Sequence, residues 1–301
     1  MRWTDLVDPS LEEALAALPA HVDPEVVETL ASLADAGAGR RPRPLIESHG
    51  PYVFGVLMAA QPLPDEDRIA YREVDFVVTP SLVVTVRKTP HDGGAPYEPT
   101  GLHHAAAESA STGALVHRLV DDVADSYLSS IDEIYGEIEE LEDAIDEWHP
   151  RRVRERISSY RHELLDARRM VSATRGAVRS IVDGRIEVGD GALFPPEIEL
   201  RFAETYETLV RVADELDIAR DLLAGVRDHH QSKIAEEQGD IVKKLTVVAS
   251  LVLVPSLIVG FFGQNFDSAF DDDYWRIGVS VGLILATTFA QLVLYRWRRW
   301  I

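Results

Sequence analysis

The chain has 301 residues and carries 30 lysines and arginines against 51 aspartates and glutamates, which gives a net charge of −21 at pH 7. This excess of acid argues against binding to nucleic acid and suits a protein that attracts cations. The chain contains no cysteine, which excludes disulfide bonds and metal sites built on thiolates.

The first part of the chain is predicted to fold as an α+β domain. Residues 10–36 have the pattern of short amphipathic helices, with Asp8-Pro9-Ser10 and Asp23-Pro24 as their start signals. Three apolar or β-branched runs predict strands of a small, mainly antiparallel sheet: residues 52–59, 74–79 and 82–87. The N-terminus mixes acids among its apolar residues and lacks the apolar core of a signal peptide, so we expect this portion in the cytoplasm.

Two long helices are predicted next. Apolar residues recur every three or four positions from Leu115 to Trp148, and His149-Pro150 interrupts the pattern. Residues 151–182 form an arginine-rich helix whose basic face could bind nucleic acid or pair with the acids of the preceding helix. Pairing within the chain is favoured because those acids are close in sequence. Residues 1–194 are therefore expected to form an α/β/α cytoplasmic domain with a helical pair.

Residues 195–244 are predicted to form a stalk helix. Pro195-Pro196-Glu197 places proline in the first turn and an acid near the positive end of the helix. Because the next proline is Pro255, the helix is expected to continue unbroken from Glu197 to Phe262, a length on the order of 100 Å.

Two uncharged stretches near the C-terminus are each long enough to cross a membrane. Residues 245–266 hold no charged side chain, and a helix of about 20 residues spans the roughly 30 Å of a bilayer's hydrocarbon core. Residues 277–295 form the second stretch, after an outer loop at residues 267–276, and residues 296–301 form a basic tail. Together they predict a two-span membrane hairpin.

The charges around this hairpin predict its orientation. Basic residues flank the two spans on one side: Lys243, Lys244, Arg296, Arg298 and Arg299. The loop between the spans is acidic and is expected to attract cations, through Asp267, Asp271, Asp272 and Asp273. Since basic flanks stay in the cytoplasm, we expect a multi-pass protein of the cell (inner) membrane with both termini cytoplasmic.

One face of the first span is small and weakly polar. Its residues recur at steps of three or four: Val242, Leu245, Ala249, Leu253, Ser256 and Gly260. Such a face is typical either of a packing seam between helices or of the wall of a narrow pore. Periodicity alone favours the packing seam.

A series of motifs closes the chain. Lys244-Leu245-Thr246 begins the first span, Pro255 interrupts it, and the run from Gly260 to Phe266 ends it with Gly263-Gln264-Asn265. Their order and separation, together with the second span and the basic tail, resemble the CorA family of divalent-cation transporters. That family carries Gly-Met-Asn at this place, so Gln264 departs from the signature and leaves the transported ion open.

The resemblance implies transport through an oligomer. Two spans of one chain cannot enclose a pore, and the family implies a homopentamer in the lipid bilayer that passes Mg²⁺, with Co²⁺ as a second substrate, into the cytoplasm. A ring of Asn265 carbonyl oxygens carries no fixed charge and can hold a hydrated dication at the entrance without trapping it. Gly263 lets the chain turn, and Gln264 adds a further carbonyl ring or packs against a neighbour. Val242, Leu245 and Leu253 are apolar enough to gate by dewetting.

Carboxylates on the stalk are the candidate metal-binding residues. Glu204 matches the position at which the family binds a regulatory divalent cation between subunits, which implies that bound Mg²⁺ keeps the pore closed. The sequence does not identify its partner carboxylate. Asp217, Asp221 and Asp228 lie on the backward extension of the pore-facing stripe and form either negative rings or solvated faces of the stalk.

The predicted function is therefore transport, with Mg²⁺ as substrate and regulatory ligand and with no cofactor. The chain has no P-loop, no His-Glu-x-x-His and no dinucleotide-binding glycine pattern, which argues against an enzyme. Two alternatives remain: a transporter of Zn²⁺ or another transition metal from the same superfamily, and a membrane-anchored coiled-coil sensor that moves no ion.

Overall fold

A computed structural model describes residues 1–34, 42–63, 68–91, 94–103, 106, 111–188, 193–263 and 273–300. The chain divides into two compact units, residues 1–227 and residues 228–301. The helix α6 (Pro196–Gly263) is 68 residues long and contributes to both units.

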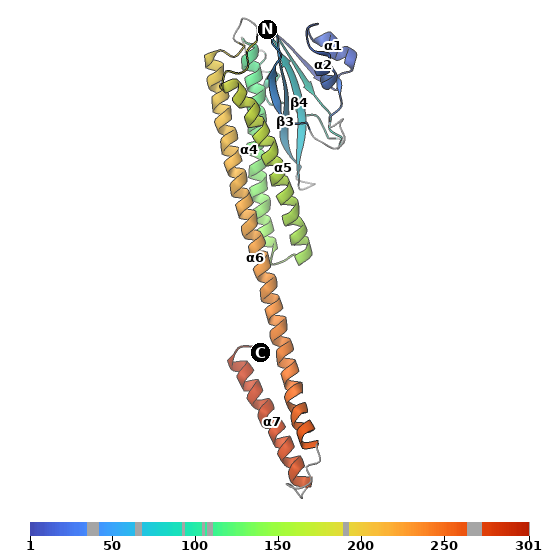
Figure 1. Cartoon of the computed structure of the whole chain (residues 1–301), viewed down its shortest axis with the longest axis vertical. Helices are drawn as coiled ribbons and strands as arrows, with labels where there is room; N and C mark the ends of the chain where they lie inside the picture. The colour runs from blue at the N-terminus through green and yellow to red at the C-terminus, as the bar shows by residue number, and fades with distance from the viewer. Residues whose placement is uncertain are drawn as a thin grey trace. The chain divides into compact units, whose positions relative to one another are not determined.

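The first unit is built on a five-stranded sheet in the order β1-β5-β4-β3-β2 (Figure 1). The strands are β1 (Arg2–Val7), β2 (Leu45–Ser48), β3 (Val53–Leu63), β4 (Arg68–Val78) and β5 (Leu82–Arg87). The pair β1–β5 is parallel and the other three pairs are antiparallel, as expected for a mainly antiparallel sheet. The sequence predicted the three central strands and missed the two at the edges.

Two short helices cover one face of the sheet. They are α1 (Leu11–Ala17) and α2 (Pro24–Ala31), and both start where the sequence predicted. Ser10 caps α1, since its hydroxyl accepts from the backbone N–H of Glu13 while the Glu13 carboxylate accepts from Ser10 in return. Their buried side chains pack against those of the sheet, among them Val26, Leu30, Phe54 and Val84.

Long helices cover the opposite face. They are α4 (Thr112–Ala144), α5 (Pro150–Val182) and the first part of α6, and their apolar faces share one core with β3 and β4. The fully buried Tyr127 of α4 donates a 2.6 Å hydrogen bond from its hydroxyl to the carbonyl oxygen of Met58 in β3. The sheet therefore lies between two layers of helices in an α+β domain.

A buried ionic cluster joins the sheet to α2. The ammonium of Lys88 lies 2.7 Å from the carboxylate of Asp75, forms an ion pair with Glu73 and donates to the carbonyl oxygen of Thr29 at 2.9 Å. All three charged residues are buried. Thr29 lies in the last turn of α2, where carbonyl groups without partners in the helix form the negative end of the helix dipole and attract a cation. Two carboxylates share one ammonium here, so the fully ionised cluster carries an uncompensated negative charge away from water.

We predict that this cluster makes stability depend on pH. Burial raises the pKa of Asp75 to about 7; Lys88 opposes the shift and Glu73 adds to it. The folded protein therefore binds a proton that the unfolded chain releases near pH 4, so this contribution to stability falls as pH rises from about 4 to about 7. Asp75→Asn should flatten that decline. Thermal unfolding of the full-length protein at pH 5 and pH 8 checks this, and parallel melting curves for both proteins would contradict it.

Candidate functional site: the apolar hairpin and the stalk

Two helices are long and apolar enough to cross a membrane. They are α6, which has an 18-residue window of mean hydropathy 2.4 near its C-terminal end, and α7 (Asp273–Trp297), whose window reaches 2.0 within Ile277–Trp297. Large apolar side chains on both helices are exposed, including Leu257 at 71% and Phe289 at 70%. So much exposed apolar surface requires lipid or another protein surface to cover it.

Within the second unit, α7 lies alongside the last part of α6 (Figure 1). The hydroxyls of Ser250 and Tyr295 are 2.6 Å apart, and the side-chain amide of Gln291 donates to the carbonyl oxygen of Ser250 at 3.5 Å. Val247, on the same side of α6 as Ser250, is only 5% exposed. This side of α6 is therefore the side that packs on α7.

The predicted pore face lies on the other side of α6. Val242, Leu245 and Leu253 are 59%, 65% and 69% exposed. Ala249, Ser256 and Gly260 are exposed as well. At 3.6 residues per turn, all six lie roughly opposite the side that contacts α7. The stripe is thus not the packing seam of the hairpin within one chain, and it remains available to another copy or to a water-filled path.

Hydroxyl groups inside the first span are satisfied by their own helix. The Ser256 hydroxyl donates to the carbonyl oxygen of Val252 at 2.7 Å, and that of Thr246 donates to Val242 at 2.8 Å. Pro255 stands inside α6 without ending it, as the sequence predicted. Local hydrogen bonds of this kind allow polar residues and proline inside a membrane helix.

On the stalk, Glu204 is exposed beside a polar contact between α6 and α4. Its neighbour Thr205 is buried, donates to the Asp121 carboxylate at 2.9 Å and lies 3.2 Å from the His117 ring nitrogen. Burial lowers the pKa of His117, although Asp121 opposes the shift. No group of three or more His, Asp or Glu side chains poised to hold a metal occurs among the described residues of the single chain.

The stalk aspartates differ in their partners. Asp217 pairs with Arg168 of α5 and lies 4.0 Å from Arg220, while Asp221 lies 3.3 Å from Arg220. Asp228 is exposed and belongs to the second unit. Because Asp217 is partly neutralised inside its own chain, it has less charge to offer a passing cation than the sequence alone suggested. The sequence predicted that arginines of α5 pair with acids of α4, and Arg156 does pair with Glu137 at 2.8 Å. It did not predict that Arg168 of α5 pairs with Asp217 of α6.

Comparison with known proteins decides the family. The sequence profile described as CorA-like Mg²⁺ transporter protein matches residues 1–299. The chain belongs to this family. The cobalt/magnesium transport protein CorA of Thermotoga maritima is 22% identical to it over 266 residues, which cover 86% of this chain and 73% of that protein.

Solved structures share the fold of this CorA-like chain. The complete structure of the CorA magnesium transporter from Methanocaldococcus jannaschii matches with a TM-score of 0.74 at 19% identity, covering 99% of this chain and 91% of that one. The cytoplasmic domain of ZntB from Vibrio parahaemolyticus matches with a TM-score of 0.55 at 13% identity, covering 78% of this chain and 88% of that one.

These findings confirm the predicted family and the predicted fold class: a sheet domain, a long helix and an apolar two-helix hairpin. The CorA-like chain is a divalent-cation transporter of the membrane and not an enzyme. Part of the predicted entrance falls outside the described residues, namely Gln264, Asn265, Asp267, Asp271 and Asp272. Gly263 ends α6, and Asp273 begins α7.

Proposed function

We propose that this protein is a homopentameric channel that passes Mg²⁺, and also Co²⁺, into the cytoplasm through a pore lined by α6. The observation that carries the proposal is the exposed stripe from Val242 to Gly260, on the side of α6 turned away from α7. Several copies that place this stripe toward a common axis would enclose a narrow path with small residues and apolar constrictions, whereas α7 would face lipid.

The entrance and the direction follow from charge. We assign Asn265 to an oxygen ring that holds hydrated Mg²⁺, and the acidic loop to the outer face, because Lys243 and Arg296 flank the spans on the inner side. Cation entry would be driven by the membrane potential, which supplies on the order of 4 to 5 kcal/mol for a dication at −100 mV. No chemical energy source is required.

Zn²⁺ is the alternative substrate, and the departure at Gln264 is the observation in its favour. A side-chain amide in place of the family's apolar Met changes the polarity beside the Asn265 ring. Amide oxygens favour hard cations such as Mg²⁺, so on ligand chemistry the alternative ranks second.

The test is ion flux into liposomes that hold the purified oligomer, with Mg²⁺, Co²⁺, Ni²⁺ and Zn²⁺ compared at one fixed potential. We expect Mg²⁺ and Co²⁺ to enter. Zn²⁺ entry with little Mg²⁺ would assign the protein to transition-metal transport, and flux of none of the four ions through an intact oligomer would refute the channel.

For regulation we assign Glu204 to a Mg²⁺ site shared with a neighbouring subunit, and we predict the effect of Glu204→Gln. A neutral side chain binds Mg²⁺ less tightly, so several-fold more cytoplasmic Mg²⁺ should be needed to reduce flux by half. Glu237→Gln, an exposed carboxylate further along α6, is the matched control and should leave that concentration unchanged. Equal Mg²⁺ sensitivity of Glu204→Gln and wild type would refute the assignment.

A further inference from the structure

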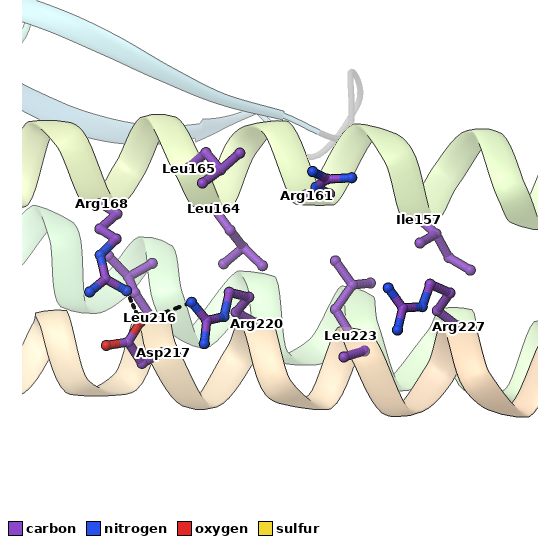
Figure 2. A pocket seen from close by; sticks show the side chains of 11 residues that line it. Ile157, Arg161, Leu164, Leu165, Arg168, Leu216, Asp217, Arg220, Leu223 and Arg227 are labelled. Atoms are coloured by element: carbon purple, nitrogen blue, oxygen red, sulfur yellow. Dashed lines mark hydrogen bonds and ion pairs between the residues drawn. The ribbon is translucent and has the colours of Figure 1, made fainter.

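A cavity of about 450 Å³ lies between α5 and α6 in the first unit (Figure 2). Its floor is apolar and is formed by buried side chains, among them Ile157, Leu164, Leu216 and Leu223. The volume falls within the roughly 300–1,000 Å³ of typical small-molecule sites, which are mostly apolar and hold a few fixed polar groups.

The rim of this cavity is basic. Arg161 and Arg168 come from α5, and Arg220 and Arg227 come from α6. Asp217 is the one carboxylate among the described lining residues, so the lining carries a charge of +3 in a chain whose net charge is −21. The cavity is thus a local region of positive charge on an acidic protein. The negative charge of the rest of the protein surface repels anions, so the cavity is the more favourable place for an anion to bind.

The two ends of the cavity differ in charge. At one end Asp217 accepts from Arg168 and lies 4.0 Å from Arg220, so much of the charge there is balanced (Figure 2). Arg161 and Arg227 lie toward the other end, on opposite helices. No carboxylate belongs to the described lining there, although Arg227 does have an interaction within its own chain. The guanidinium group of Arg161 makes no hydrogen bond or ion pair in the part of the chain that the structure describes.

We propose that this cavity binds a small soluble organic phosphate. Its phosphate group lies between Arg161 and Arg227, and its less polar body covers the leucines of the floor. The planar guanidinium group matches phosphate oxygens and forms paired, charge-assisted hydrogen bonds with them. Leu165, which lines the cavity and is 40% exposed, would lose contact with water when the body binds. The assignment does not depend on which ion the channel carries.

The test uses isothermal titration calorimetry of the full-length protein in detergent, with EDTA present and about 0.15 M salt. ADP is the probe, because it joins phosphate groups to a less polar body. We expect one ADP site per chain, and at least ten-fold weaker binding in Arg161→Gln and in Arg227→Gln. Arg151→Gln is the matched control, since Arg151 is an exposed arginine of α5 that pairs with Glu155 outside the cavity.

Two further binding measurements distinguish contacts with the phosphate groups from contacts with the less polar part of ADP. Inorganic pyrophosphate lacks the body and should bind at least ten-fold more weakly than ADP. Leu165→Ser should weaken ADP binding and leave pyrophosphate binding unchanged. The substituted arginines and Leu165 are exposed, so these variants should keep the wild-type melting temperature, which circular dichroism checks.

The proposal is overturned if ADP does not bind, if the arginine variants bind ADP as tightly as wild type, or if pyrophosphate binds as tightly as ADP. Loss of ADP binding in nanodiscs of phosphatidylglycerol but not of phosphatidylcholine would assign the cavity to lipid headgroups instead. Absence of ADP binding together with an altered oligomer size in Arg161→Gln would show that a second copy of the chain covers it.

Discussion

Replacing Asn265 with alanine is expected to abolish Mg²⁺ entry into liposomes, lowering the flux at least a hundred-fold while the oligomer stays intact. Confining a hydrated dication in a narrow pore costs free energy. A ring of amide oxygens that accept hydrogen bonds from the ion's water shell offsets this free energy without adding fixed charge. Alanine has no side-chain oxygen to replace that of the amide. Because the ring repeats the change in every subunit, one substitution removes all of its ligands at once.

The matched control for this prediction is Gln264→Met, which restores the residue of the family signature one position away. It should retain Mg²⁺ entry, since the Asn265 ring is unchanged. Size-exclusion chromatography in detergent confirms that each variant assembles like wild type. If Asn265→Ala conducts Mg²⁺ as well as wild type, Asn265 does not form the entrance, and a hairpin that serves only as an anchor becomes the better explanation.

The elements of this protein were predictable from sequence wherever a local signal fixed them. The run after Lys244 has no charge until Asp267, and no residue between Pro196 and Pro255 stops a helix, so the long helix and its apolar end followed from composition and spacing. Ser10 marks a helix start through a cap that the structure contains. These signals act within a few residues and need no knowledge of the fold.

The edge strand β1 was missed because its pairing partner is distant in the chain. In β1, Trp3 donates to the Thr85 hydroxyl at 3.1 Å and Asp5 pairs with Arg87 at 2.7 Å. The six-residue sequence of β1 includes the charged residues Arg2 and Asp5 and does not alternate strictly between polar and apolar residues, so the pattern that predicts a strand is absent. Its parallel partner β5 comes more than seventy residues later in the chain, so no turn signal links them.

The ion pairs of the stalk could not be predicted from the sequence for a similar reason. Helical spacing predicts which residues of α6 share a face, but the register of α5 against α6 decides which of them meet an arginine. That register depends on how Leu164, Leu216 and their neighbours pack, which is a tertiary property. For the pore stripe, helical spacing likewise predicts that its residues share one face of α6, but only the contacts of α7 with Ser250 show that this face is not the seam between α6 and α7.

The buried ammonium of Lys88 is expected to be the most sensitive single position for the stability of the sheet domain. Lys88→Met keeps a side chain of similar length but leaves Glu73 and Asp75 without a cation, and both are less than 5% exposed. Removing one partner of a buried ion pair typically costs about 3–5 kcal/mol, because the remaining charge has neither water nor a counter-ion. The hydrogen bond to Thr29 is lost as well, which loosens α2 from the sheet.

Thermal unfolding of the full-length variant, followed by circular dichroism, measures this loss as a lower melting temperature. A second variant shows whether the destabilisation comes from the unpaired carboxylates or from altered packing around residue 88. Adding Asp75→Asn to Lys88→Met removes one of the two stranded carboxylates, so the double variant should melt at a higher temperature than Lys88→Met alone. Arg151→Met, at an exposed pair of α5, should change stability by less than about 1 kcal/mol. A Lys88→Met protein that melts within a degree of wild type, or a double variant no more stable than the single one, would show that the cluster is not held together by charge.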